Sequence, residues 1–358
     1  MAIWVVFGHI MMGLPSFFTY FPNNLYNYVP VDVFIILSGF VITYLLDKEY
    51  VNYRSYIVGR AFRIFPVYLV TLLVSTLSLG FAKSVLISAP EGAATAARIH
   101  LIELAKSDLT AHVLANVTLL QGLLPNQLLP AAAYTIVGQA WSLTLEWQFY
   151  LIAPFLFVLM TSLNKLKSCL IAIAVIISLV AAGRYFGREF LGNNLPLFGV
   201  GFTGFLIYKN GFSRFRSAPA LMAIVAVNAV ALYQNVAAMI IWWAALFCVA
   251  GGQNKAARVI HDLLASKFAI FLGRISYPLY MIHMQAFFTT LWLANELHLS
   301  TVARVVALPL IGVPSSLLMA YLLHHAVEMP FHNIGRRLAA GLRQKNQTGS
   351  FTAGCSST

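Results

Sequence analysis

Charged residues are scarce in this sequence. Only 9% of its 358 residues are Asp, Glu, Lys or Arg, whereas a soluble domain has about 25%. Apolar residues make up 60% of the chain. Such a composition excludes an intrinsically disordered protein and is a poor fit to a soluble enzyme or a nucleic-acid-binding module. It indicates a polytopic membrane protein, and we expect no nucleic-acid partner.

Cysteine is rare as well, with Cys169, Cys248 and Cys355 as its only positions. Their spacing matches no zinc motif and implies no disulfide framework, so we expect no metal site. The first residues lack a charged segment and a small-residue cleavage site, so they do not predict a cleaved signal peptide.

Long apolar runs are abundant instead. A helix needs about 20 mostly apolar residues to cross a bilayer. The runs predict an all-α membrane protein with ten transmembrane helices. These cover residues 2–18, 29–46, 64–82, 134–160, 169–182, 195–208, 218–233, 236–250, 268–293 and 302–327. The shorter run 113–124 is expected to be interfacial or re-entrant.

The basic residues predict the orientation. If the N-terminus is cytoplasmic, most of the 23 Lys and Arg residues fall in inside loops or the tail, as the positive-inside rule requires. The outside segments then hold only Lys83, Arg98, Lys106, Arg184, Arg188 and Arg304. Ten spans place both termini in the cytoplasm. We expect a membrane domain of residues 1–335 and a polar, disordered tail of residues 336–358.

Two ionisable residues lie near the outer ends of the first two predicted spans, His9 and Asp32. Ionisable groups inside membrane spans are costly, so each is a functional hypothesis. Adjacent antiparallel helices would place both at similar depth. A carboxylate beside an imidazole fixes its tautomer and raises its basicity, which is how a general base is built. A structural polar pair is the alternative.

Further ionisable residues lie in later spans. Glu146 and His283 are inside apolar runs, and His283 could serve chemistry or a structural hydrogen bond. His324, His325 and Glu328 lie near the inner end of the last span, where interfacial snorkelling also explains them.

A pair of arginines marks the cytoplasmic edge of the third span. Arg60 and Arg63 are three residues apart, so in a helix they share one face. Two guanidinium groups suit a phosphate-rich ligand. Positive-inside topology alone would also explain the pair.

Five ordered motifs resemble those of the membrane acyltransferase-3 family. Residues 31–40, VDVFIILSGF, are similar to its "VDxFFxLSGF", and residues 60–68, RAFRIFPVY, to "RxxRIxPxY". Residues 141–154, WSLTLEWQFYLIAP, resemble "WSLxxExxFYxxxP". Residues 272–283, LGRISYPLYMIH, resemble "LGxISYxLYxxH", and residues 328–331, EMPF, the closing "ExPF". From His9 to Phe331 they span nearly the whole chain.

The resemblance implies a multi-pass inner-membrane enzyme. Such enzymes move an acyl group, often acetyl, from coenzyme A to a hydroxyl of a carbohydrate or related acceptor. It implies that His9 is the catalytic histidine and that Arg60 and Arg63 contact the acyl-CoA phosphates. Asp32 and Glu146 match acidic positions of the family and are expected in the catalytic set.

Four residues of the matched motifs are expected to bind substrate or to support the site. Ser38 lies in a Ser-Gly-Phe bend, where we favour a backbone-positioning role over a nucleophilic one. Trp141 could stack on a sugar ring, although membrane interfaces also enrich tryptophan. Tyr150 and His283 complete this group.

One departure from the family concerns the start of the chain. Family members open with a segment like "LDGLRGLA", whose arginine is considered functional, whereas Met1 precedes His9 by eight residues. We expect an upstream extension that encodes an arginine about eleven residues before His9.

Two other classes of function fit ten spans with buried ionisable residues. A transporter or flippase for a lipid or glycan would favour broken helices and repeat symmetry, which the sequence does not show. A membrane sensor or scaffold would show neither turnover nor transport.

Overall fold

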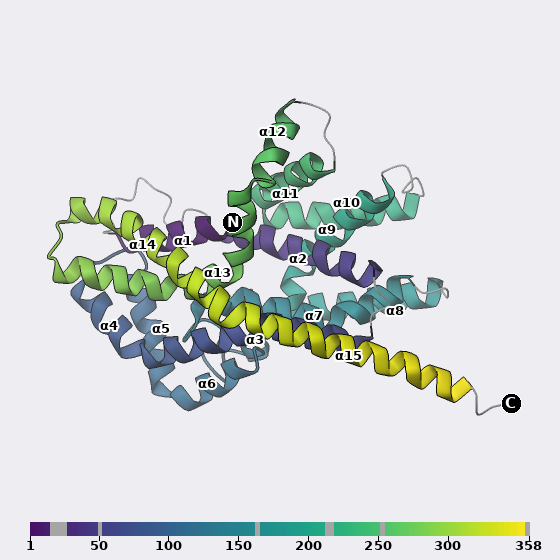
Figure 1. The fold of residues 1–358 in the computed structure, drawn as a ribbon, viewed down its shortest axis with the longest axis horizontal. Helices are drawn as coiled ribbons and strands as arrows, with labels where there is room; N and C mark the ends of the chain where they lie inside the picture. Colours follow the sequence, from purple (N-terminus) through teal and green to yellow (C-terminus); the bar gives the residue numbers. More distant parts are fainter. Residues whose placement is uncertain (15–26, 49–51, 162–164, 212–217, 251–254, 355–358) are drawn as a thin grey trace.

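The computed structural model describes residues 1–14, 27–48, 52–161, 165–211, 218–250 and 255–354 (Figure 1). Within them the regular structure is helical. The helices are α1 (Ala2–Met11), α2 (Tyr28–Lys48), α3 (Tyr53–Leu77), α4 (Leu79–Ser88), α5 (Thr95–Ser107), α6 (Leu109–Val117), α7 (Trp141–Thr161), α8 (Lys165–Ala182), α9 (Leu191–Asn210), α10 (Ala218–Gln234), α11 (Val236–Val249), α12 (Lys255–Leu264), α13 (Lys267–Glu296), α14 (Thr301–Leu323) and α15 (Met329–Gly354).

Apolar helices long enough to cross a membrane confirm a multi-pass, all-α architecture. By length and composition five stretches of the described residues qualify: Tyr28–Lys48, Tyr53–Leu77, Gly138–Met160, Leu166–Tyr185 and Thr301–Gln344. Shorter apolar helices include Ala2–Met11 and Val236–Val249. The count of ten spans and the cytoplasmic placement of the termini therefore stay predictions.

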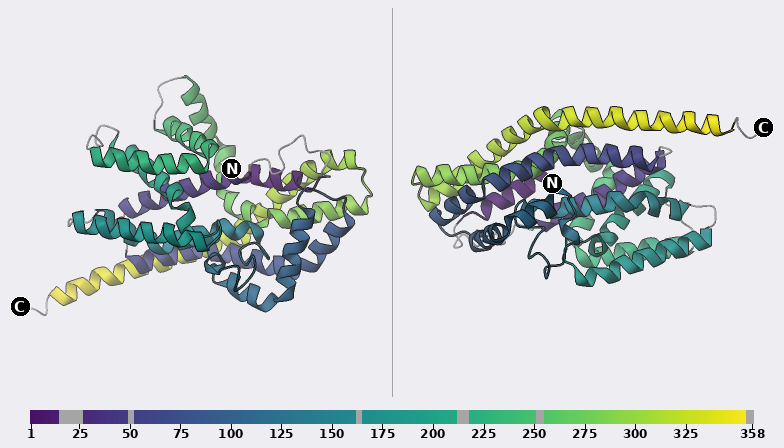
Figure 2. Two further views of the ribbon diagram at one scale, coloured as in Figure 1. Left: turned by 180° about the vertical axis from the view of Figure 1, so that it is seen from behind. Right: turned by 90° about the horizontal axis from the view of Figure 1, so that it is seen from below.

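Most of the long helices run along the long axis of the molecule (Figure 1). Helices α4 and α5 gather toward one end, and the C-terminus projects from the other (Figures 1 and 2). Helix α13 packs against α14, α1 and α4, and so connects the first and last parts of the chain.

Helices α2 and α9 make the closest helix contact, and two glycines allow it. A Cβ atom on Gly39 would lie 2.3 Å from the carbonyl oxygen of Phe198, and one on Gly201 would lie 2.0 Å from that of Ile36. Only glycine fits at such distances, as in other membrane helix pairs. The expected Ser-Gly-Phe bend is wrong, because α2 continues through Gly39; the expected close backbone approach is confirmed.

The predicted outside loop of residues 83–133 is largely helical. Asp108 caps α6 by accepting a hydrogen bond from the backbone of Ala111 at 3.0 Å. Gly92 lies against the end of α1, where a Cβ atom would be 2.8 Å from the carbonyl oxygen of Met12. Helix α5 and the segment before it lie against the end of α1, and α5 packs against both α4 and α6. The predicted interfacial piece 113–124 includes the last turn of α6.

Several predicted spans begin or end differently in the structure. The third was expected over residues 64–82, but α3 covers Tyr53–Leu77 and a separate helix, α4, begins at Leu79. The first span was expected over residues 2–18, but α1 ends at Met11, and residues 15–18 lie outside the described part. The fourth was expected from residue 134, but α7 begins at Trp141 because residues 134–137 run as non-helical chain. Tyr134, Thr135 and Ile136 of this non-helical chain line the cavity described below.

The tail differs from expectation. Residues from Gly335 were expected to be disordered, but α15 continues to Gly354 and packs along α3 (Figure 2). Small residues permit this contact, since a Cβ atom on Gly335 would lie 2.3 Å from Cβ of Phe62. The Nε atom of Arg343 donates a hydrogen bond to Ser55 Oγ at 2.9 Å. Residues up to Arg343 are therefore attached to the helical domain.

Candidate functional site

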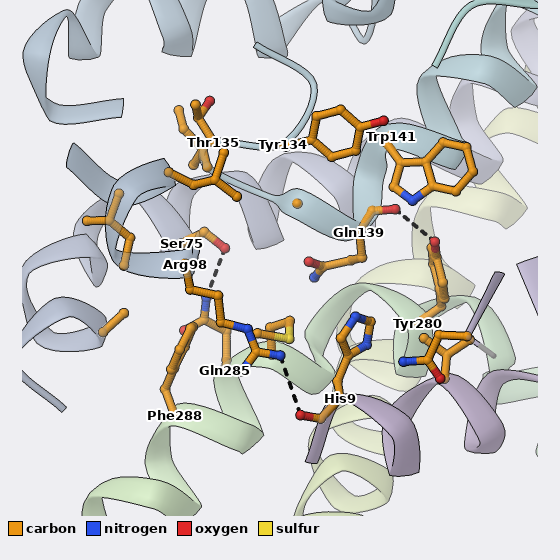
Figure 3. Close-up of a pocket in the computed structure, with 18 of the residues that line it drawn as sticks. His9, Ser75, Arg98, Tyr134, Thr135, Gln139, Trp141, Tyr280, Gln285 and Phe288 are labelled. Atoms are coloured by element: carbon orange, nitrogen blue, oxygen red, sulfur yellow. Dashed lines mark hydrogen bonds between the residues drawn. The ribbon is translucent and has the colours of Figure 1, made fainter. Parts of the chain in front are cut away.

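A cavity of about 420 Å³ lies between α1, α5, α13 and the segment before α7 (Figure 3). We call it the outer cavity, because its residues lie toward the predicted outer ends of the spans. Its lining combines apolar, aromatic and polar side chains. The polar and aromatic ones include His9, Ser75, Arg98, Tyr134, Gln139, Trp141, Arg188, Tyr280 and Gln285.

Two histidines meet at the wall of this cavity. Nδ1 of His9 lies 3.0 Å from Nε2 of His283, and the rings stack with centroids 5.0 Å apart. His9 comes from α1 and is half-buried, whereas His283 comes from the middle of α13 and is 1% exposed. The packing of α1 against α13 therefore joins two residues that are 274 positions apart.

The hydrogen bonds of His283 determine which nitrogen of His9 can act as a base. Nδ1 of His283 lies 2.9 Å from the carbonyl oxygen of Tyr280, which can only accept, so this nitrogen carries the proton. A neutral His283 then accepts at Nε2, and the proton between the rings belongs to Nδ1 of His9. That tautomer leaves a lone pair on Nε2 of His9.

The sequence suggested that Asp32 orients His9, but the structure shows no hydrogen bond between these two residues. Its carboxylate is 2% exposed and forms an ion pair with Arg188. It also accepts a hydrogen bond from Nδ2 of Asn235 at 2.7 Å. His283 takes the expected place of Asp32 beside His9, while Asp32 holds Arg188 at the cavity wall.

Trp141 lines the outer cavity, and a set of hydrogen bonds fixes the segment that carries it. The Tyr280 hydroxyl donates to the carbonyl oxygen of Gln139 at 2.8 Å and lies 2.8 Å from Ser142 Oγ. The guanidinium of Arg188 lies 5.1 Å from the centroid of the Trp141 ring. The indole is thus held with a cation on one face.

Glu146 belongs to a separate buried network. Its Oε1 atom accepts hydrogen bonds from Ser38 Oγ at 3.1 Å and from the Tyr150 hydroxyl. The guanidinium of Arg60 lies 5.8 Å from the centroid of the Tyr150 ring. The structure therefore brings Ser38, Glu146 and Tyr150 together, and this group connects to Arg60 rather than to His9.

Arg60 and Arg63 open onto two neighbouring cavities along α15. A cavity of about 440 Å³, the arginine cavity, is lined by Arg60, His332, Arg336 and Arg343. The Nε atom of Arg60 is buried and has no hydrogen-bond partner among the described residues. Three guanidinium groups around one cavity match the phosphates of a nucleotide.

The second of these cavities, of about 500 Å³, has Arg63, Arg274 and His332 in its lining. It also contains the π-helical turn His324–Glu328, in which Nδ1 of His324 lies 2.6 Å from Glu328 Oε2. Such turns are frequent at functional sites. His332 lines both cavities, so Arg60 and Arg63 face adjacent parts of one basic region.

Several of these site residues were not singled out from the sequence. Arg98 and Arg188 counted only as outside charges, and Arg336 and Arg343 only as part of the tail. Their positions depend on packing between distant segments, which no local motif encodes. One signal was present in the sequence. Few cations fall in the predicted outside segments, and two of these cations, Arg98 and Arg188, line the outer cavity.

Comparison with known families decides the classification. Residues 1–325 match the family described as "Acyltransferase domain", the acyltransferase-3 family. The chain belongs to the acyltransferase-3 family. No curated protein and no solved structure was found to match it.

Membership of the acyltransferase-3 family identifies the chain as a membrane acyltransferase. The matched region contains the histidine pair, the Glu146 network and both arginines of α3. The arginines of α15 lie beyond it. The part of the arginine cavity formed by α15 is therefore a feature of this chain that lies outside the matched family region.

Proposed function

We propose that this acyltransferase moves an acyl group, with acetyl as the proposed group, from acyl-CoA to a hydroxyl of a cell-surface or exported carbohydrate. The observation that carries the proposal is the separation of two unlike sites. The outer cavity holds a histidine in a defined tautomer, and the arginine cavity gathers guanidinium groups elsewhere in the bundle.

The donor site is proposed at the arginine cavity. Arg60, Arg336 and Arg343 line it, and phosphates form bidentate hydrogen bonds with guanidinium groups. The unpartnered Nε of Arg60 supports a ligand at this position, because a buried donor without a partner is costly. The prediction that the basic loops are cytoplasmic supports a donor site here, because coenzyme A is in that compartment.

The acceptor site is proposed at the outer cavity. Trp141, Tyr134 and Tyr280 provide faces for sugar rings, and Ser75, Gln139 and Gln285 provide hydrogen-bonding groups. A small set of polar groups among apolar and aromatic ones is typical of ligand sites of this size.

The proposed chemistry begins at Nε2 of His9. This atom takes the proton of the acceptor hydroxyl while the hydroxyl oxygen attacks the thioester carbonyl carbon. The carbon–sulfur bond then breaks, and the thiolate leaving group of coenzyme A takes the proton back from His9. His283 holds the ring of His9 throughout, since its own Nδ1 proton is bound to the Tyr280 carbonyl. The products are the acyl ester and free coenzyme A.

The test is transfer of radiolabel from acetyl-CoA to glycan in membranes that contain the full chain. His9→Ala should reduce transfer by about 10² to 10⁴-fold, the usual contribution of a general base. His261→Ala is the matched control, because His261 is exposed on α12 and lines neither cavity. Undiminished transfer by His9→Ala would refute the assignment, and glycan transport without label transfer would favour a transporter or flippase.

A further inference from the structure

The outer cavity has a positive charge that the histidine chemistry does not use. Arg98 and Arg188 both line it, and no Asp or Glu is among its described lining residues. A general base needs no cation beside it, and a neutral sugar needs none to be bound. The proposed proton transfer therefore leaves this charge without an assigned role.

The two arginines are not equivalent. Arg188 forms an ion pair with Asp32, so its charge is largely neutralised. Arg98 forms no ion pair with a described carboxylate. The net positive charge of the cavity is therefore that of Arg98.

Contacts with α1 and α13 hold Arg98 in the cavity. Its Nη2 atom donates a hydrogen bond to the carbonyl oxygen of His9 at 3.4 Å (Figure 3). Its guanidinium lies 4.7 Å from the centroid of the Phe287 ring on α13. Arg98 belongs to α5, and the segment just before this helix lies against the end of α1 at Gly92.

These contacts leave hydrogen-bonding capacity on Arg98. A guanidinium has five N–H donors, and the bond to His9 uses one. Helix α5 is not among the candidate spans, and burial lowers the pKa of Arg98 to about 10. The side chain is thus still charged at pH 7 and has donors to offer a ligand in the same cavity as His9.

We propose that the acceptor carries an anionic group, a carboxylate or a phosphate, and that Arg98 binds it in the outer cavity. This inference rests on the proposed function, which makes the ligand of the outer cavity the acyl acceptor. Tyr134 and Trp141 lie across the cavity from Arg98 and His9 (Figure 3). An acidic sugar held between them would have its ring against the aromatic side and its anion on Arg98, with a hydroxyl near His9.

Ligand binding tests this without any need for turnover. The probes are methyl β-D-glucuronoside and methyl β-D-glucoside, which differ in a carboxylate against a hydroxymethyl group. Binding to the purified full chain in detergent is followed by saturation-transfer NMR titration. The wild-type chain should prefer the glucuronoside by about 10- to 100-fold, the value of a charged hydrogen bond. Glucose 6-phosphate, titrated in the same way, separates a phosphate from a carboxylate preference.

The variants separate a ligand contact from a structural role. Arg98→Gln should remove the preference, and Arg98→Lys should keep most of it because the charge remains. Lys106→Gln is the matched control, since it removes an exposed charge from the same helix and should leave the preference unchanged. Equal binding of both glycosides and of glucose 6-phosphate by the wild-type chain, including no binding of any of the three, would overturn the proposal.

One more arm excludes a different source of the anion. If Arg98 bound an anionic acyl group instead, Arg98→Gln would change the ratio of succinyl-CoA to acetyl-CoA use and leave the glycoside preference intact. That outcome would also overturn the proposal. Loss of transfer in His9→Ala with an intact glycoside preference would support both His9 as the general base and Arg98 as the anion-binding residue. Transfer and glycoside binding are separate measurements, so either assignment can fail without the other.

Discussion

The outer cavity and the arginine cavity differ in how their charges are arranged. In the outer cavity a buried histidine controls a second histidine, and one of two arginines is neutralised by Asp32. In the arginine cavity three arginines lie together without a carboxylate in the lining. The first arrangement suits proton transfer to a selected group, and the second suits the binding of several phosphate charges. The polar residues of the bundle are thus divided between two cavities of unlike charge rather than gathered in one place.

Helix α2 lines both cavities, through Val31 and Leu45, and packs against α9, so breaking that contact should have the largest effect. Gly201→Ala places a Cβ atom within 2.0 Å of the Ile36 carbonyl oxygen, and the backbone must move. We expect a loss of about 1 to 3 kcal/mol or more in stability, as for other overpacked sites. Size-exclusion chromatography of a fluorescent fusion and the midpoint of thermal unfolding should both report it.

The control for that substitution is Gly80→Ala. Gly80 is in α4, and a Cβ atom there would meet nothing within 4 Å. Alanine should be neutral or slightly stabilising, because it favours helix more than glycine does. Equal behaviour of the two variants would mean that the close contact of α2 and α9 does not support the fold.

Removal of His283 should affect the outer cavity alone. His283→Ala takes away the acceptor for Nδ1 of His9, so the tautomer is no longer fixed. We expect kcat for acyl transfer to fall about 10²-fold, within the range of general-base effects. The KM for acyl-CoA should not change, because the arginine cavity is intact. His283→Gln, whose amide oxygen can accept the same hydrogen bond, should recover part of the activity.

A purely structural role for His283 predicts another result. Both variants would then lower the amount of folded protein, and kcat per folded molecule would stay near the wild-type value. This outcome would return the histidine pair to the structural alternative that the sequence also allowed.

The sequence predicted the class of fold because hydrophobicity is a local property. Apolar runs predicted helices such as 29–46, and α2 covers Tyr28–Lys48. Family motifs likewise identified His9 and Glu146 as site residues before any contact was known. The predicted partner of His9, Asp32, was wrong. The position of Asp32 in its span gave no sign that its carboxylate forms an ion pair with Arg188.

The tail shows a second limit of local patterns. Polarity predicted disorder after Gly335, yet α15 packs along α3 through small residues and a hydrogen bond from Arg343 to Ser55. Contacts between segments 288 residues apart determine this structure, and such contacts leave no periodic signal. The arginine cavity could not be predicted for the same reason, since two of its three guanidinium groups, those of Arg336 and Arg343, come from α15, beyond the family match.

The arginines of α15 should have the smallest effect, confined to the donor. Arg336→Ala with Arg343→Ala removes two cations from the arginine cavity but leaves Arg60 and the outer cavity in place. If they bind acyl-CoA phosphates, the KM for acyl-CoA should rise about tenfold, while kcat and the KM for the acceptor stay unchanged. The effect is small because partly exposed charge contacts contribute less than fully buried ones.

Arg337→Ala is the matched control, since Arg337 is adjacent in α15 but lines neither cavity. Raised salt should reduce the difference between the double variant and the wild-type chain, because it screens exposed charges. A fall in kcat with unchanged donor KM would show instead that α15 supports the fold of α3, and that Arg60 holds the donor without it.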